Sequence, residues 1–137
     1  MNAQNRYKLD LREIHFCLFE QFRLGELLGK APFEAWGEDE VRMVLAECYR
    51  WVCEVIGPLN GVGDATGCRL EEGAVKAPPG FREAWRSLYE HGWKAVAVAE
   101  EHRGQGAPHT VQAVIEEMLS GANAAFTMYP GLAAAAA

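Results

Sequence analysis

The sequence predicts an all-α fold, a helical-bundle domain with irregular loops. Apolar residues recur at three- and four-residue spacing in several separate segments, which is typical of amphipathic helices. Glycine and proline punctuate these segments, and their order is helix, helix, long loop, helix, loop, helix. Half of the 137 residues are hydrophobic and 23% are charged, which is ordinary for one globular domain.

The N-terminal part is expected to form a helix over residues 9–22. Its apolar face is broad, because four residues at helical spacing are joined by two phenylalanines: Leu11, Ile14, Leu18, Phe22, Phe16 and Phe19. A helix with so much apolar surface must dock on another element. Residues 24–29 are expected to add a short turn or second helix, closed by Gly29.

The strongest helical signal spans residues 38–59. Three acidic residues begin this segment, where negative charge suits the helix dipole, and an apolar stripe follows them. Pro58 and the Asn60-Gly61 pair predict that the helix ends there. Residues 61–78 are rich in glycine and are expected to form a long loop, with a short extended pair near residues 68–70 and 74–75.

Another helix is predicted from Pro79 to about residue 89, with four residues facing inward: Phe81, Trp85, Leu88 and Tyr89. The apolar residues 95–99 could form a buried strand or a connector. Pro108 suits the start of the next helix, which residues 121–123 interrupt.

The C-terminal stretch is expected to hold a short helical or extended piece over residues 124–129. Pro130-Gly131 are then expected to end this piece. The five alanines at residues 133–137 are too short a segment to form a helix in water by themselves. The chain is therefore expected to be the front part of a larger protein that continues beyond residue 137.

Charge and cysteine content restrict the class of protein. The formal net charge is −6 and no basic stripe is present, so a nucleic-acid partner is not expected. No apolar run approaches the roughly 20 residues of a membrane span. Because residues 1–12 are polar and do not resemble a secretory leader, the four cysteines are expected to be reduced thiols in the cytoplasm.

A glycine motif near residue 104 invites a nucleotide-binding interpretation. Residues 95–99 precede Gly104-Gln105-Gly106 and a helical pattern follows, as in a dinucleotide fingerprint. However, His109 stands at the third glycine position, and four polar residues separate the apolar run from the first glycine. A flexible turn that enters a helix is the favoured interpretation.

The remaining polar residues do not form a recognisable catalytic or metal site. No C-x-x-C pair exists and no two histidines share a helical i,i+4 spacing, so zinc is not expected. His15 and Cys17 would point apart on a helix, which favours a packing role for the cysteine. Glu116 and Glu117 are adjacent, so they would point in different directions and form a solvated face.

Short blocks in a fixed order cover nearly the whole chain. They are YKLDLRE at 7–13 with Phe16, LGELL at 24–28, PLN at 58–60, VGD at 62–64, GCRL at 67–70, PPGFREAW at 78–85, GW at 92–93, GQG at 104–106, PH at 108–109, EEML at 116–119, AN at 122–123 and MYPGL at 128–132. Together they resemble the N-terminal region of acyl-CoA dehydrogenases, in particular the long bacterial subgroup. By this resemblance, residues 1–33 are an N-terminal helical extension and residues 34–137 are the family's N-terminal α-domain, incomplete at its C-terminal end.

The resemblance implies an FAD-dependent enzyme that introduces an α,β double bond into an acyl-CoA thioester in fatty acid β-oxidation. In the family, a glutamate takes the α-proton, the flavin takes the β-hydride, and an electron-transfer flavoprotein or oxygen accepts the electrons. By this resemblance, the chain is expected to end before the domain that holds most of the FAD and before the catalytic glutamate. No catalytic residue is therefore expected in it.

The resemblance also suggests where this segment meets the substrate. Phe126, Met128 and Tyr129 are expected to approach the acyl pocket, although the residues alone favour core packing for this apolar stretch. The implied partners are the rest of the polypeptide or a complementary subunit, an acyl-CoA and other copies in a homo-oligomer. Two alternatives remain: a non-catalytic helical interaction module derived from the same scaffold, and a small metal or redox protein.

Overall fold

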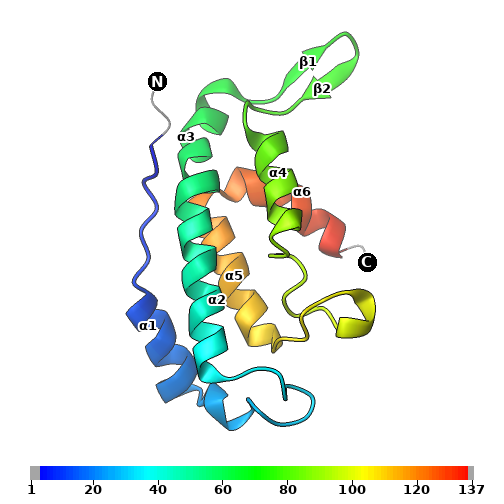
Figure 1. The fold of residues 1–137 in the computed structure, drawn as a ribbon. Coiled ribbons are helices and arrows are strands. Elements are labelled where there is room, and N and C mark those ends of the chain that lie inside the picture. The colour runs from blue at the N-terminus through cyan, green and yellow to red at the C-terminus, as the bar shows by residue number, and fades with distance from the viewer. Residues whose placement is uncertain (1–3, 136–137) are drawn as a thin grey trace.

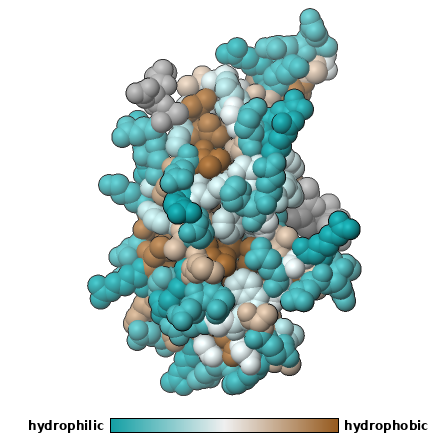
Figure 2. Space-filling model, in the orientation of Figure 1, coloured by the Kyte–Doolittle hydropathy of each residue, from teal (hydrophilic) through white to brown (hydrophobic). Residues whose placement is uncertain are grey.

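A computed structural model describes residues 4–135 and confirms a mostly helical fold. Helix α2 (Glu38–Trp51), a π-helical turn (Val52–Ile56) and helix α3 (Gly57–Thr66) together form one long column. Helix α5 (His109–Ala122) packs along this column, and α4 (Phe81–Glu90) and α6 (Ala124–Ala135) complete the bundle (Figure 1). None of the described helices is long and apolar enough to cross a membrane. On the face drawn in Figure 2, most of the surface is hydrophilic and limited hydrophobic patches lie between the hydrophilic residues.

The N-terminal helix is present in two parts. Helix α1 (Leu11–His15) begins at Asp10, whose side chain accepts a hydrogen bond from the Arg12 N–H at 2.9 Å, and a π-helical turn (Phe16–Gln21) follows. A 3-10 turn (Leu24–Glu26) comes next. The extension docks through Leu18 and Leu24, which are buried, whereas Phe16 and Phe22 are 52% and 68% exposed.

An extended arm before α1 lies along the outside of the column, as the blue segment in Figure 1 shows. The Tyr7 ring lies over Gly121 of α5 and meets the Tyr49 ring edge-on, with 6.1 Å between centroids. Tyr49 Oη accepts a hydrogen bond from the Leu9 N–H at 3.2 Å. Burial, assisted by the nearby Glu117 carboxylate, raises the pKa of Tyr7 to about 12. The arm is thus packed against both α2 and α5.

The long column corrects the prediction that the helix ends near Pro58. In the π-helical turn, the Gly57 N–H donates to the Val52 carbonyl five residues earlier. Pro58 then falls in the first turn of α3, where a missing N–H costs little. The helix continues to Thr66 and ends before Gly67, whose φ of 62° is a left-handed conformation.

A β-hairpin follows α3 and projects from one end of the bundle (Figure 1). Strand β1 (Arg69–Glu71) pairs antiparallel with β2 (Ala74–Lys76), which confirms the predicted extended pair. Glu72 and Gly73 connect them with φ values of 50° and 77°, as a tight hairpin turn requires. Leu70 lies opposite Val75, and both are exposed.

Helix α4 buries Phe81, Ala84 and Leu88, and Trp85 is half-buried. The prediction that Tyr89 faces inward is wrong, because Tyr89 lies beside this stripe, 47% exposed, with its ring 5.1 Å from that of Trp85.

Residues 95–99 form a connector rather than a strand, and they lead into a 3-10 turn (Glu100–His102). Val96 of this connector is fully buried, which accounts for the apolar signal without a sheet.

Helix α5 buries the stripe that the sequence predicts: Val111, Val114, Ile115, Met118 and Leu119. After a break at Asn123, α6 runs through Pro130, so the predicted exit at Pro130-Gly131 is wrong. Pro130 is buried and follows Phe126 by one helical turn, so its missing N–H removes one hydrogen bond while its ring packs inward. Residues 133–135 continue α6 and residues 136–137 lie outside the described part.

Asn123 fixes the start of α6 against the column. Its side chain is 1% exposed and its Nδ2 donates to the Ile56 carbonyl at 3.1 Å. Its Oδ1 accepts from the Phe126 N–H at 3.0 Å, which caps the first turn of α6. One buried amide therefore joins two helices that are 67 residues apart in the chain.

The arm packing predicts that Gly121→Ala destabilises the protein through Tyr7. A Cβ at this position would lie 2.8 Å from Tyr7 Cε2, and the rigid ring must lift away. Relative to Gly61→Ala in the open part of α3, we expect a loss of about 1–3 kcal/mol in unfolding free energy, measured in urea. In a Tyr7→Ala background the two substitutions should have equal effects. Equal effects in the wild-type background would contradict the packing.

The buried junction predicts a graded response at Asn123. Asn123→Ala removes the helix cap and the hydrogen bond to the Ile56 carbonyl, and we expect a loss of about 2–3 kcal/mol in urea unfolding. Asn123→Ser keeps an acceptor for the cap and should lose less. The exposed Asn60→Ala in α3 serves as the matched control and should be nearly neutral. A neutral Asn123→Ala would show that the junction does not hold α6.

An aromatic groove between the hairpin, α4 and α6

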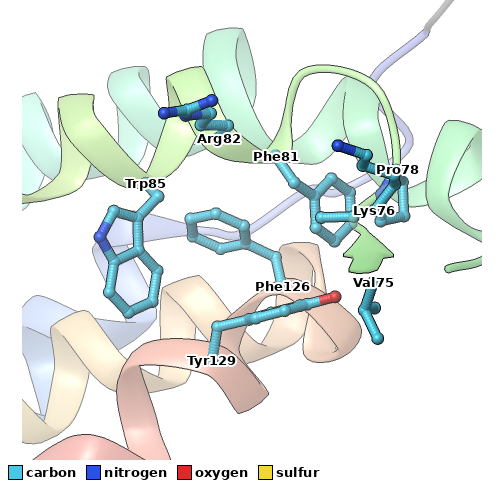
Figure 3. Close-up of a pocket in the computed structure, with 9 residues that line it drawn as sticks. Val75, Lys76, Pro78, Phe81, Arg82, Trp85, Phe126 and Tyr129 are labelled. Atoms are coloured by element: carbon cyan, nitrogen blue, oxygen red, sulfur yellow. The ribbon is translucent and has the colours of Figure 1, made fainter. Parts of the chain in front are cut away.

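A groove of about 450 Å³ opens between the hairpin, the N-terminal half of α4 and the first turns of α6. Figure 3 shows aromatic rings from α4 and α6 facing one another across it. The groove is mainly apolar, and its lining residues are Val75, Lys76, Ala77, Pro78, Phe81, Arg82, Trp85, Phe126 and Tyr129. Its size lies within the range of about 300–1,000 Å³ that is typical of small-ligand sites.

Phe81 is the fixed centre of the groove. Its ring is buried and meets the rings of Phe126 and Tyr129 edge-on, at 5.6 and 6.0 Å between centroids and 79° in both pairs. Gly63 of α3 lies directly behind it, since a Cβ there would come within 2.8 Å of Phe81 Cζ. The absence of a side chain at Gly63 therefore lets Phe81 sit deep enough to support both α6 rings.

Tyr129 forms the wall of the groove on α6. Its ring is 41% exposed, and its Oη lies 3.2 Å from Cys68 Sγ, a hydrogen bond in which either atom can donate. This hydrogen bond, together with partial burial, raises the pKa of Tyr129. The phenol is therefore a neutral group at physiological pH.

The structure separates the three residues that the resemblance places near the acyl group. Phe126 is 1% exposed and lies at the bottom of the groove, and Tyr129 lies at its side. Met128 is 60% exposed and does not line the groove. The substrate-binding role of all three stays a prediction.

Sequence reasoning did not connect the hairpin and α4 with this groove. Val75 and Trp85 lie more than 40 residues before Phe126 in the chain and share no local pattern with it. Lys76 and Arg82 stand at the rim with exposed side chains, and neither forms an ion pair within residues 4–135. An apolar groove with positive charge at its rim suits an apolar ligand that carries an anionic end.

The glycine motif at residues 104–106 is a tight turn, as the sequence favours. The backbone N–H groups of four successive residues, 104 to 107, donate to carbonyls in the connector over residues 95–99. A Cβ on Gly104 would overlap the Val98 carbonyl, which explains the glycine. These donors are occupied, so the loop is not built to cradle a phosphate.

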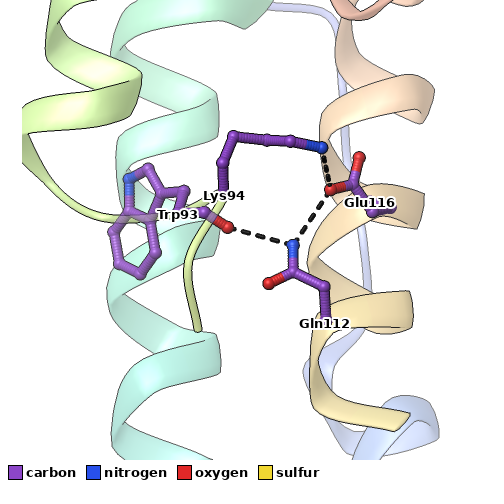
Figure 4. Close-up of polar contacts among 4 residues, drawn as sticks. All are labelled: Trp93, Lys94, Gln112 and Glu116. Atoms are coloured by element: carbon purple, nitrogen blue, oxygen red, sulfur yellow. Dashed lines mark hydrogen bonds and ion pairs between the residues drawn. The ribbon is translucent and has the colours of Figure 1, made fainter. Parts of the chain in front are cut away.

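Glu116 is not simply part of a solvated face, which corrects the sequence interpretation. Its Oε1 lies 2.5 Å from Lys94 Nζ and accepts from Gln112 Nε2 at 2.9 Å (Figure 4). Gln112 Nε2 also donates to the Trp93 carbonyl at 3.0 Å. This cluster fixes the connector after α4 to α5 and does not face the groove residues.

The thiols and histidines show no assembled reactive centre in the part of the chain that the structure describes. Burial raises the pKa of the Cys48 thiol to about 12, so it is a neutral packing group. His15 packs its ring 6.2 Å from Phe19, and burial together with Arg42 lowers its pKa. Among the described residues, no three potential metal ligands lie close enough together to hold an ion.

Comparison with known proteins gives consistent matches. The family model described as "Acyl-CoA dehydrogenase, N-terminal domain" matches residues 38–137. The chain is 30% identical over 124 residues to 3-methylmercaptopropionyl-CoA dehydrogenase of Ruegeria pomeroyi. This alignment covers 90% of this chain and 21% of that protein. It is 28% identical over 129 residues to the broad-specificity linear acyl-CoA dehydrogenase FadE5 of Mycobacterium tuberculosis, covering 93% of this chain and 21% of that protein.

The match begins where the column begins, and it includes the hairpin, α4, α5 and the α6 wall of the groove. Both relatives also align with part of the N-terminal extension, since each alignment is longer than the 100 residues from 38 to 137. The chain spans about a fifth of the length of these relatives. By the family match over most of its length, this chain belongs to the acyl-CoA dehydrogenase family, as its N-terminal domain.

Proposed function

We propose that this chain is the N-terminal part of an FAD-dependent acyl-CoA dehydrogenase and that its aromatic groove covers the acyl group of the substrate. The family match over residues 38–137 carries the proposal, and the groove gives the domain a surface of the required chemistry. The reaction removes a proton from the α-carbon and a hydride from the β-carbon of the thioester, which leaves an enoyl-CoA.

The described residues do not fit a complete FAD. The groove of about 450 Å³ is too small and too apolar for a dinucleotide, and the N–H groups of the 104–106 loop are already engaged. We therefore assign the FAD and the catalytic base to the remainder of the enzyme. That remainder is either a further part of the same polypeptide or a complementary subunit.

The contribution of this chain is binding and exclusion of water. Phe81, Phe126 and Trp85 present fixed aromatic surfaces to an alkyl chain, and burial of each methylene contributes about 0.8 kcal/mol. Lys76 and Arg82 at the rim suit the anionic coenzyme A portion. We further propose that the complete enzyme is a homo-oligomer in the cytoplasm and acts in fatty acid β-oxidation. An electron-transfer flavoprotein or a similar acceptor would take the electrons from its flavin.

A second candidate is a non-catalytic helical interaction module derived from the same scaffold. The N-terminal extension favours it, because Phe16, Phe22 and Leu27 are each more than half exposed. Such exposed apolar side chains suit contact with another protein. This module would form a stable complex without flavin.

The complete enzyme, purified with this chain as its N-terminal part, should be a yellow flavoprotein that converts acyl-CoA to enoyl-CoA. Trp85→Ala should raise KM for the acyl-CoA about tenfold, because it removes one wall of the groove. Met43→Ala, exposed on α2 and outside the groove, is the control and should leave KM unchanged. Met128→Ala tests the contact with the acyl group that the family resemblance predicts for Met128, and a raised KM would support that contact.

Steady-state kinetics with absorbance of the enoyl product measures these effects. A colourless preparation without enoyl-CoA formation would contradict the proposed function and favour the interaction module. An active enzyme in which Trp85→Ala and Met43→Ala behave alike would retain the enzymatic function but remove the groove from the acyl site.

A further inference from the structure

Cys68 and Tyr129 connect two segments on different sides of the groove. Cys68 lies directly before β1 at the base of the hairpin, and Tyr129 lies on α6, 61 residues later in the chain. Figure 3 shows the Tyr129 phenol pointing toward the hairpin end of the groove. Cys68 itself does not line the groove. Its contact with the groove is made through the tyrosine hydroxyl.

The Tyr129 ring needs this anchor because little else holds it. It is 41% exposed on the helix surface, and its described ring contact is the edge-on one with Phe81 at 6.0 Å. An exposed side chain on a helix ordinarily exchanges between rotamers. The 3.2 Å contact with Cys68 Sγ restricts this freedom at the far end of the ring, and it joins α6 to the hairpin base.

We propose that the Cys68–Tyr129 hydrogen bond is a specificity determinant, which fixes Tyr129 as a rigid wall and restricts the groove to slender, unbranched acyl groups. The inference rests on the proposed function and names the substrate class within it. Cys68 is a positioning residue, because it acts only through Tyr129. Phe81 and Phe126 are buried, whereas Tyr129 is 41% exposed and is positioned by its ring contact with Phe81 and its hydroxyl contact with Cys68.

In a rigid apolar pocket, one extra or missing methylene changes kcat/KM by about 10- to 200-fold. A branched isomer places one of its carbons sideways, against the wall. A wall that moves aside admits the branched isomer and loses part of this discrimination. Loss of one hydrogen bond corresponds to about a three- to tenfold change, so the kcat/KM ratio of straight over branched substrate is expected to fall by that factor.

The test compares hexanoyl-CoA with its isomer 4-methylpentanoyl-CoA in the complete enzyme. Cys68→Ala and Tyr129→Phe should each lower the ratio of kcat/KM, straight over branched, about fivefold. Cys68→Ser, whose hydroxyl can still bond the phenol, should keep the wild-type ratio within about twofold. The double variant Cys68→Ala, Tyr129→Phe should match the single variants, because both remove the same contact.

A second measurement reports the contact independently of catalysis. NMR of ¹³C-labelled tyrosine, assigned with Tyr129→Phe, follows the phenol titration. Cys68→Ala should lower the pKa of Tyr129 toward its ordinary value, and Cys68→Ser should not.

The outcomes separate the inference from the proposed function. An unchanged phenol pKa in Cys68→Ala overturns the inference, because the contact is then absent. A lowered pKa with an unchanged kcat/KM ratio also overturns it, but leaves acyl-CoA dehydrogenation intact. A wild-type enzyme that turns over neither isomer nor any other acyl-CoA overturns the proposed function and the inference with it.

Discussion

The hydrogen bonds of one buried amide join α6, which carries two residues of the groove, to the long column. Asn123 connects the carbonyl of Ile56, at the end of the π-helical turn, with the first turn of α6. Every groove residue on α6 takes its position from this junction. Because the site is buried, water cannot replace either partner, and the direction in which α6 leaves α5 is strongly specified. The π-helical turn and the start of α6 are therefore joined through Asn123.

The groove is assembled from parts that have different rigidity. Phe81 and Phe126 belong to the packed interior, and Gly63 allows the first of them to lie close to α3. Val75 and Tyr129 are more exposed and depend on the hairpin and on a single polar contact. The Tyr129 side of the groove therefore keeps its position only while the contact with Cys68 is present.

Local sequence signals predicted much of the fold and little of the groove. The buried stripe of α5 and the hairpin follow from spacing and turn residues alone. The two proline predictions failed for a tertiary reason: a change in hydrogen-bond register places Pro58 in a first turn, and packing keeps Pro130 inside α6. The family resemblance pointed to Phe126, Met128 and Tyr129, of which Phe126 and Tyr129 line the groove and Met128 does not. Trp85 and Cys68 join them only through folding, and no periodic pattern links such distant positions.

The packed arm at the N-terminus has a consequence for the order of events during synthesis on the ribosome. Tyr7 leaves the exit tunnel early, but it packs on Gly121, which is 114 positions later in the chain. At translation speeds of about 5–20 residues per second, the first segment to emerge waits roughly 6–23 seconds for its binding surface. The contact of the arm with α5 therefore forms only after most of the chain has been synthesised, later than its contact with Tyr49 of α2.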